Sequence, residues 1–337
     1  GGKARLCYSA ELEKVGMAAA LSTTRYDMRA ATVGKYALFA GGYISKSSFG
    51  YSVSSSVDAY NTSLTKSTPT ELSCKRCGHA AASVGGYALF AGGASSYNLL
   101  NFYENLVSAV DAYDASLTRS AAHIIGATVA IGGAAVGNYA LFAGGTVYSQ
   151  INEDNVTSDV LAYDPSLTFT TAPWLSVARA NVKGASAGNY ALFAGGRAGS
   201  FCTTVDAYNA SLTRTTATAL SSTKNNSAAA TVGNHAIFVG NTASADIYDA
   251  SLTKTSAAIL STARTGLAAT TVGDYAIFSG GGVADFCDAS LTRSSIGTSM
   301  TGYDMGAATI GDYALFAGGY SDEKSVTTYD SVEVYTA

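Results

Sequence analysis

The sequence predicts an all-β fold in which seven four-stranded antiparallel sheets form a closed ring. Three observations support this prediction: one short apolar segment recurs seven times along the 337 residues, a second segment follows six of the copies, and the two chain ends hold complementary parts of one repeat. Repetition at a period of roughly 40–50 residues is typical of a β-propeller, whose blades bury their faces against each other. We therefore predict one domain over residues 1–337, a seven-bladed β-propeller.

The first recurring segment predicts the two leading strands of each blade, A and B. It reads Tyr-Ala-Leu-Phe-Ala-Gly-Gly in its commonest form, and its copies begin at Tyr36, Tyr87, Tyr139, Tyr190, His235, Tyr275 and Tyr313. An almost unbroken apolar run fits a strand that is covered on both faces, which we assign as strand B. The glycine pair after it allows positive φ and close backbone approach. The Ala-rich run before it, such as residues 30–33, is strand A.

The second segment predicts strands C and D. In the first blade it reads Asp-Ala-Tyr-Asn-Thr-Ser-Leu-Thr from Asp58, and its equivalents begin at Asp111, Leu161, Asp206, Asp246 and Asp285. The Asp-Ala-Tyr stretch belongs to strand C. The Asp/Asn-x-Ser that follows suits a turn in which a short polar side chain bonds the backbone. Strand D then alternates along stretches such as residues 212–220, as a half-exposed outer strand does.

The chain ends indicate how the ring is closed. The chain stops after a C-like strand at Tyr335, while residues 7–22 resemble the end of strand C and all of strand D. We predict that residues 4–22 pair into the last blade with residues 300–337. Such pairing removes the open edges that an all-β protein must otherwise protect.

These repeats resemble the kelch repeat, in which a glycine pair is followed by a strand that carries a tyrosine. The tyrosines that carry the resemblance are Tyr60, Tyr113, Tyr163, Tyr208, Tyr248 and Tyr335, with Cys287 in the sixth blade. Kelch repeats also place a tryptophan shortly after this tyrosine, whereas Trp174 lies at a different offset. The chain is similar to Ala/Ser/Thr-rich kelch variants of bacterial and phage surface proteins. This implies an extracellular or surface-exposed location, within a larger polypeptide or assembly.

Composition argues against several kinds of partner. With 20 Lys+Arg against 24 Asp+Glu and no basic block, the chain lacks the clustered cations of a nucleic-acid surface. No apolar run approaches the roughly 18 residues needed to span a bilayer, so we expect no membrane insertion. Three scattered histidines and the single Cys74-x-x-Cys77 pair do not make a metal set, and we predict no metal and no cofactor. Cys74 and Cys77 fit either a local disulfide or two unrelated thiols.

The B–C loops break the symmetry of the repeats. They lie on the same face as the D–A connections, they nearly vanish in blades 5 and 6, and they are long in blades 7, 1, 2 and 3. The long loops carry the aromatic residues Tyr43, Phe49, Tyr51, Tyr97, Phe102, Tyr103, Tyr148 and Tyr320. Aromatic and polar residues on variable loops of a rigid scaffold are typical of a recognition surface. The alternative is that the insertions pack only on themselves.

The D–A connections carry a cation at one repeat position. The cations are Arg25, Arg76, Arg179, Lys224 and Arg264, and Thr128 and Gly302 interrupt the series. Arg25, Arg76, Arg179 and Arg264 are candidates for meeting an acidic ligand at the channel mouth. The alternative is that they bond carbonyl groups of their own blade, and five copies at one position favour this structural role.

The leading functional hypothesis is a non-enzymatic recognition module that binds a glycan or a protein through the B–C loops of blades 7, 1, 2 and 3. A second hypothesis is a small-molecule enzyme, such as a sugar mutarotase, at the channel mouth. A third is a purely structural spacer. A glycosidase needs two carboxylates in one cleft. The long loops offer Glu104, Glu153, Asp154, Asp322 and Glu323 for that role, but sequence does not place them.

Overall fold

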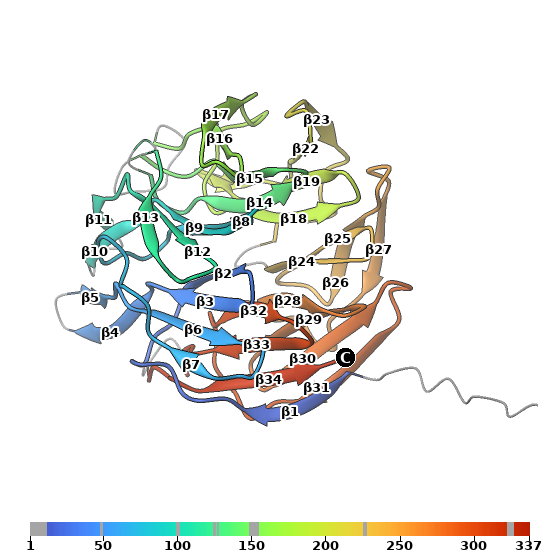
Figure 1. Cartoon of the computed structure of the whole chain (residues 1–337). Coiled ribbons are helices and arrows are strands. Elements are labelled where there is room, and N and C mark those ends of the chain that lie inside the picture. Colours follow the sequence, from blue (N-terminus) through green and yellow to red (C-terminus); the bar gives the residue numbers. More distant parts are fainter. Residues whose placement is uncertain are drawn as a thin grey trace, which may run out of the picture.

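The protein is all-β, with sheets arranged around a common centre in a propeller-like architecture (Figure 1). The computed structural model describes residues 12–47, 50–98, 102–123, 126, 128–147, 155–224, 228–321 and 327–337. These residues form eight four-stranded antiparallel sheets and one two-stranded sheet. They contain no helix, and therefore none that is long and apolar enough to cross a membrane.

Seven of the four-stranded sheets each contain one copy of the repeat, and we number these repeat sheets 1 to 7 along the chain. Their A strands are β2 (Arg29–Val33), β8 (Ala80–Val84), β14 (Gly132–Val136), β18 (Lys183–Ala187), β24 (Ala228–Val232), β28 (Ala268–Val272) and β32 (Gly306–Ile310). Their B strands are β3 (Tyr36–Ala40), β9 (Tyr87–Ala91), β15 (Tyr139–Ala143), β19 (Tyr190–Ala194), β25 (His235–Val239), β29 (Tyr275–Gly280) and β33 (Tyr313–Ala317).

The two outer strands of each repeat sheet follow in the same order. The C strands are β6 (Val57–Asn61), β12 (Val110–Asp114), β16 (Val160–Tyr163), β22 (Val205–Asn209), β26 (Ser244–Tyr248), β30 (Val283–Asp288) and β34 (Val332–Thr336). The D strands of sheets 1 to 6 are β7 (Lys66–Ser67), β13 (Arg119–Ala121), β17 (Phe169–Ala172), β23 (Arg214–Ala217), β27 (Lys254–Ala258) and β31 (Arg293–Gly297). The four-stranded antiparallel order predicted for each repeat is confirmed.

The last repeat sheet takes its outer strand from the N-terminus. Strand β1 (Glu13–Met17) pairs antiparallel with β34, so sheet 7 has the order β1-β34-β33-β32. This pairing is the one predicted for the N-terminal segment; residues 1–11 of that segment lie outside the described residues. In Figure 1 the blue β1 runs beside the red β34.

The D strands begin later than the sequence pattern suggests. Strand D was expected to start at Leu212, but Leu212 has φ 57° and β23 starts at Arg214. The side-chain oxygen of Asn209 accepts hydrogen bonds from the backbone N–H groups of Ser211 (3.0 Å) and Thr213 (2.9 Å). This side chain therefore extends the turn through Leu-Thr, and the predicted Asp/Asn-x-Ser turn is confirmed.

The core lies between neighbouring repeat sheets. Strand β3 is buried from Ala37 to Ala40, and one apolar cluster joins Leu38 and Val57 of sheet 1 to Phe90 and Tyr113 of sheet 2. Within sheet 1, Phe39 and Tyr60 pack edge to face with ring centroids 5.9 Å apart. The buried hydroxyl of Tyr60 donates to the carbonyl oxygen of Ala19 at 2.7 Å, so this repeated tyrosine leaves no polar group unpaired.

The A strands contact each other in cyclic order at the centre, from β2 and β8 round to β32 and β2 (Figure 1). Close approach between the strands explains their small residues. A Cβ atom on Gly133 would lie 2.4 Å from the carbonyl oxygen of Ala81, and one on Gly184 would lie 2.2 Å from that of Gly133.

A series of hydroxyl groups connects the A strands. At the fourth position of six of the seven A strands, a Ser or Thr hydroxyl donates to the carbonyl oxygen of the equivalent residue one sheet earlier. The pairs are Ser83 to Thr32, Ser186 to Ala135, Thr231 to Ser186, Thr271 to Thr231, Thr309 to Thr271 and Thr32 to Thr309. Ala135 is the one member of the seven without a hydroxyl, so the series lacks only the bond from β14 to β8.

We expect Ala135→Thr to complete this series and to raise the free energy of unfolding by about 1 kcal/mol, the usual net value of one intramolecular hydrogen bond. Ala135→Val is the matched control, because it adds similar bulk and the same β-branching without the donor. Urea denaturation should place the Thr variant above the Val variant. Equal stability of the two variants would show that the hydroxyl bond contributes nothing.

Candidate functional site

The B–C loops of repeats 1 and 2 are joined into the eighth four-stranded sheet. Repeat 1 supplies the hairpin of β4 (Tyr43–Ser47) and β5 (Gly50–Val53), and repeat 2 supplies β10 (Ala94–Asn98) and β11 (Phe102–Leu106). Strands β5 and β10 pair antiparallel with Tyr51 opposite Tyr97, which gives the order β11-β10-β5-β4 (Figure 1). We call this layer the loop sheet. The B–C loop of repeat 4 forms only a short hairpin, β20 (Arg197–Ala198) with β21 (Ser200–Phe201).

Six tyrosines gather at the loop sheet, which itself contributes three of them. This tyrosine cluster consists of Tyr26, Tyr43, Tyr51, Tyr97, Tyr303 and Tyr320. The ring centroid of Tyr43 lies 5.1 Å from that of Tyr26, 5.4 Å from Tyr51 and 5.8 Å from Tyr97. Such separations are those of mutually stabilising aromatic pairs. The cluster is therefore a packed, rigid unit.

The repeat geometry itself places four of the six tyrosines of this cluster. Tyr26 follows the cation position of the D–A connection, and Tyr43 follows the glycine pair. The two exchange backbone hydrogen bonds of 3.0 and 2.8 Å, and Tyr303 and Tyr320 do the same at 3.0 and 3.1 Å. The pairs at the same two positions in repeats 2, 3 and 4 are Cys77 with Ala94, Val129 with Thr146, and Ala180 with Arg197. Only repeats 7 and 1 of these five carry two tyrosines there.

Four of the predicted aromatic residues, Tyr43, Tyr51, Tyr97 and Tyr320, thus lie together. Phe102 and Tyr103 lie in β11, whereas Phe49 and Tyr148 fall outside the described residues. The prediction missed Tyr26 and Tyr303. Their signal was present in the sequence, because each stands 17 residues before a tyrosine that follows a glycine pair.

A pocket of about 230 Å³ opens next to the cluster, and we call it the mouth pocket. Tyr26 and Tyr43 form one part of its wall. Its other lining residues are Asp27, Arg29, Gly78, Asn181, Lys183, Leu267, Asp304 and Met305. The pocket therefore combines aromatic rings with carboxylate, amide, guanidinium and ammonium groups.

The rim of the mouth pocket is fixed by backbone hydrogen bonds between successive D–A connections. The residue two positions after the cation has a left-handed backbone, with φ from 49° to 65°, in Asp27, Gly78, Ala130, Asn181, Gly266 and Asp304. The N–H of Asp27 donates to the carbonyl oxygen of Asp304 at 2.7 Å, and Asn181 donates to Ala130 at 2.7 Å. Asp and Asn tolerate this conformation better than most residues. The side chains of Asp27, Asn181 and Asp304 are thus held on a rigid rim.

Two of the charged groups in the pocket, Arg29 and Asp27, pair with each other. Arg29 donates to a carboxylate oxygen of Asp27 at 2.7 Å and to the carbonyl oxygen of His79 at 2.9 Å. Lys183 begins strand β18 and faces the same cavity. Burial lowers the pKa of Lys183, and the positive charge of Arg29 lowers it further.

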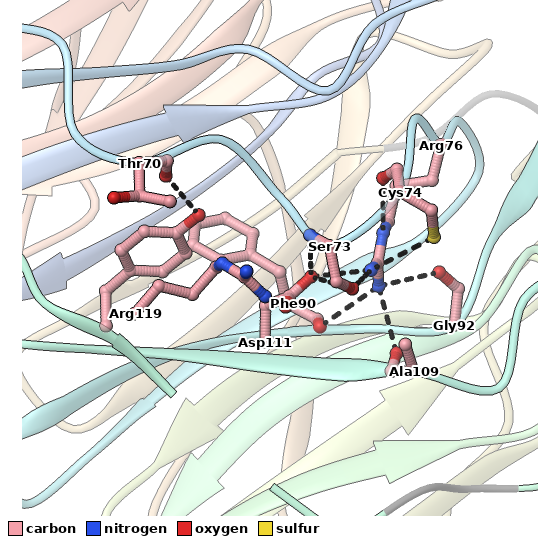
Figure 2. Close-up of polar contacts among 10 residues, drawn as sticks. Thr70, Ser73, Cys74, Arg76, Phe90, Gly92, Ala109, Asp111 and Arg119 are labelled. Carbon is pink, nitrogen blue, oxygen red and sulfur yellow. Dashed lines mark hydrogen bonds and ion pairs between the residues drawn. The ribbon is translucent and has the colours of Figure 1, made fainter. Parts of the chain in front are cut away.

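The repeated D–A cations lie away from the pocket, buried inside their own repeat sheets. Arg76 is fully buried and pairs with Asp111 at 2.6 Å (Figure 2). It also donates to the carbonyl oxygens of Ala109 (2.9 Å) and Gly92 (3.3 Å), while Arg119 approaches the other carboxylate oxygen of Asp111 at 2.8 Å. Each buried charge thus has several partners, as burial requires.

The same arrangement recurs in four other repeat sheets. The pairs are Arg25 with Asp58, Arg179 with Asp206, Lys224 with Asp246, and Arg264 with Asp285. Burial lowers the pKa of Arg25, and Asp58 opposes that shift. Arg25, Arg76, Arg179 and Arg264 were predicted as candidate ligand contacts, with carbonyl bonding as the alternative. Each of the four pairs with a carboxylate of its own repeat. The first three also donate to carbonyl oxygens of that repeat, as the alternative expects, whereas no such bond is found for Arg264 among the described residues.

Repeat 3 lacks every member of this ion-pair set. Thr128 stands at the cation position, Leu161 at the aspartate position and Phe169 at the position of the D-strand cation. Phe169 instead stacks on His123 with centroids 4.6 Å apart. All three groups are therefore lost together in repeat 3, whereas repeat 7 has Gly302 at the cation position but keeps a carboxylate, Glu333, paired with Lys14 of the outer strand.

The remaining candidate groups form no second site in the part of the chain that the structure covers. No cluster of three or more His, Cys, Asp or Glu residues that could hold a metal occurs among the described residues. Cys74 and Cys77 are free thiols, so the local disulfide is absent. The loop carboxylates Glu153, Asp154, Asp322 and Glu323 fall outside the described residues, and Glu104 lies in β11.

At the mouth pocket and the tyrosine cluster, aromatic and charged side chains thus converge on one cavity. Comparison with known proteins does not supply a function for this place. The chain matches no protein-family model, and a search of curated proteins finds no relative.

Proposed function

We infer that the seven repeat sheets are the blades of one closed propeller of the kelch type, and that the loop sheet is an addition to blades 1 and 2. Contacts between the first and last repeats support closure. Thr32 donates to Thr309, the N–H of Asp27 to the carbonyl of Asp304, and the N–H of Gly319 to the carbonyl of Arg25. The last of these bonds has an equivalent between repeats 1 and 2, where the N–H of Gly42 donates to the carbonyl oxygen of Arg76.

We propose that the protein is a non-enzymatic recognition module that binds a glycan at the mouth pocket, beside the tyrosine cluster. The observation that carries this proposal is the continuity of the two features, since Tyr26 and Tyr43 belong to both. Rigid aromatic rings give contact area at little entropic cost. Convergent polar groups such as Asp27, Asn181 and Asp304 suit the hydroxyl groups of a sugar.

The size of the pocket favours a small group over an extended one. Its volume of about 230 Å³ is below the roughly 300–1,000 Å³ typical of pockets for drug-sized ligands. A single terminal sugar residue fits this scale, while the loop sheet and the tyrosine cluster offer a wider surface for the sugars that follow. We assign the recognition face to blades 7, 1 and 2; the predicted loop of blade 3 falls on residues 148–154, which lie outside the described ones.

The arginines proposed to act in the enzyme hypothesis are engaged in ion pairs within their own repeats. A mutarotase at the channel mouth was assigned Arg25, Arg76, Arg179 or Arg264, and the side chains of all four are buried or nearly so against their own aspartates. Among the carboxylates of the mouth, Asp27 already accepts a hydrogen bond from Arg29. These commitments favour binding over catalysis.

The proposal predicts that Tyr97→Ala reduces binding on a glycan array by about tenfold or more, since truncating one aromatic anchor typically costs 1–2 kcal/mol or more. Tyr97 is partly buried in the cluster and belongs to the loop sheet, so the repeat sheets should keep their melting temperature. Tyr190→Ala is the matched control, a half-buried tyrosine at the opposite end of a repeat sheet. Absence of any glycan binding by the parent protein, or equal losses in both variants, would contradict the proposal.

A further inference from the structure

An axial channel continues below the mouth pocket. Two cavities of about 200 and 550 Å³ lie along the A strands, and they share Ala30, Gly184, Ala229 and Ala307 in their walls. The upper cavity also shares Arg29 and Lys183 with the mouth pocket. We call the level of these two side chains, where the mouth pocket meets the upper cavity, the throat of the channel. A group that enters at the mouth therefore meets Arg29 and Lys183 there.

The throat is positively charged below an acidic rim. Among the described lining residues, Asp27 and Asp304 line only the mouth pocket. Arg29 and Lys183 are the charged residues of the upper cavity, and the lower one is lined by Ala, Gly, Ser and Thr. Within a low-dielectric channel such a charge is screened far less than on an open surface. Since Arg29 already pairs with Asp27, the ammonium group of Lys183 is the cation at the throat that favours an anion.

Lys183 has no structural task that the other repeats share. The equivalent first residues of the A strands are Ala80, Gly132, Ala228, Ala268 and Gly306, with Arg29 as the other cation. The side-chain ammonium of Lys183 has no hydrogen-bond or ion-pair partner within the described part of the chain, although its backbone pairs with Ala194 in the sheet. Lys224, by contrast, donates to the carbonyl of Ser244 at 3.1 Å and pairs with Asp246 at 3.4 Å.

The electrostatic surroundings of Lys183 also favour the binding of an anion beside it. Burial and Arg29 lower its pKa, while Asp27 and Asp304 act in the opposite direction but do not restore the ordinary value. The ammonium group thus sits in an environment that disfavours its charge. An anion bound against it would offset this cost and raise its pKa again.

We propose that the throat of the channel is an oxyanion site in which Lys183 contacts an acidic group, a carboxylate or a sulfate, of the bound sugar. This inference rests on the proposed function, because it places the acidic group in the pocket assigned to the terminal sugar residue, and it adds that the ligand is an acidic glycan. Arg29, Asp27 and Asp304 are the other charged groups that face Lys183 in this pocket.

The test compares the binding of D-glucuronate, D-glucose 6-sulfate and D-glucose by titration followed in amide NMR spectra. Lys183→Ala should fold normally, because Ala occupies the same position in three other repeats. Lys35→Ala is the matched control, since it removes an exposed lysine from an A–B turn at the far end of repeat sheet 1. We expect at least one of the two acidic sugars to bind the parent and Lys35→Ala equally, and to bind Lys183→Ala at least tenfold more weakly. The sugar that binds identifies the oxyanion as carboxylate or sulfate.

Affinity for the acidic sugar should also fall as the pH rises, because Lys183 loses its charge while the ligand keeps its own. Equal binding to the parent and to Lys183→Ala, or no binding of either acidic sugar, would overturn the inference. If Tyr97-dependent binding of neutral glycans persisted in that case, the oxyanion site alone would fail and the proposed recognition function would stand.

Discussion

Replacing Arg76 by Thr, the residue at the equivalent position of repeat 3, should lower the free energy of unfolding by about 3 kcal/mol. Breaking a buried ion pair typically costs about 3–5 kcal/mol, because the remaining charge is left uncompensated. We expect the lower end of this range, since Asp111 keeps Arg119 at 2.8 Å and the Ser73 hydroxyl at 3.0 Å. Urea denaturation with an unchanged m-value would measure the loss.

The triple variant Arg76→Thr, Asp111→Leu, Arg119→Phe should recover most of this loss. It copies into repeat 2 the uncharged set of repeat 3, Thr128, Leu161 and Phe169, so no buried charge remains without a partner. Replacing a buried ionic triad by apolar residues of similar volume is often neutral or stabilising. A triple variant as unstable as the sum of the three single variants would show that the groups do not act as one compensating set.

Replacing His79 by Met should stabilise the protein and remove part of its acid sensitivity. His79 is fully buried, and neither ring nitrogen has a hydrogen-bond partner among the described residues. The equivalent positions in repeats 1 and 7 hold Met28 and Met305, so the position accepts a methionine. An unsatisfied buried polar group costs about 1–3 kcal/mol, which is the gain expected near neutral pH.

The pH dependence follows from the direction of the His79 shift. Burial, first, and the nearby charge of Arg76, second, hold the pKa of His79 well below its ordinary value of 6.5. Between that value and the folded pKa, the unfolded chain binds the extra proton, so stability falls as the pH falls. Within that range the loss approaches about 1.4 kcal/mol per pH unit.

Denaturation of the parent and of His79→Met at several pH values measures this contribution directly. Titrating carboxylates affect both proteins alike, so the difference between the two curves isolates His79. We expect the difference to widen from pH 7 to pH 5. A constant difference would mean that His79 is not held neutral in the fold.

The elements that recur were predictable from the sequence. The run from Tyr36 to Ala40 has one apolar pattern repeated with little change, and the turn at Asn209 is fixed by its own side chain, so local chemistry decides both. The N-terminal pairing of β1 with β34 was also predictable, because the two chain ends carry complementary parts of one repeat.

The elements that occur once were not predictable. The loop sheet depends on the pairing of Tyr51 with Tyr97, two residues from separate insertions for which no other repeat provides a pattern. Tyr26 was overlooked because it stands in a D–A connection, and its role appears only when Tyr43 is placed beside it. Lys183 lies at the start of a small-residue strand, and only the convergence of seven such strands shows that it faces a channel.

The ion pairs were only partly predictable from the sequence. Arg76 and Asp111 each belong to a repeated position, and repeat 3 lacks both. Because 35 residues separate them in the sequence, no local pattern indicates that they are in contact. The sequence therefore indicated a structural cation without its partner. Joint loss of Arg and Asp positions in one repeat is the sequence signal that would have paired them.

Hydrogen–deuterium exchange with and without the strongest-binding glycan of the array tests the central claim, that recognition occurs where blades 7, 1 and 2 depart from the common repeat. We predict that ligand slows exchange in residues 26–29, 43–47, 50–53, 94–98 and 303–304, which belong to the rim and the loop sheet. The A–B turns at the opposite end, such as residues 33–36 and 187–190, should exchange unchanged. Protection confined to those turns, or spread evenly over all seven repeats, would contradict the claim.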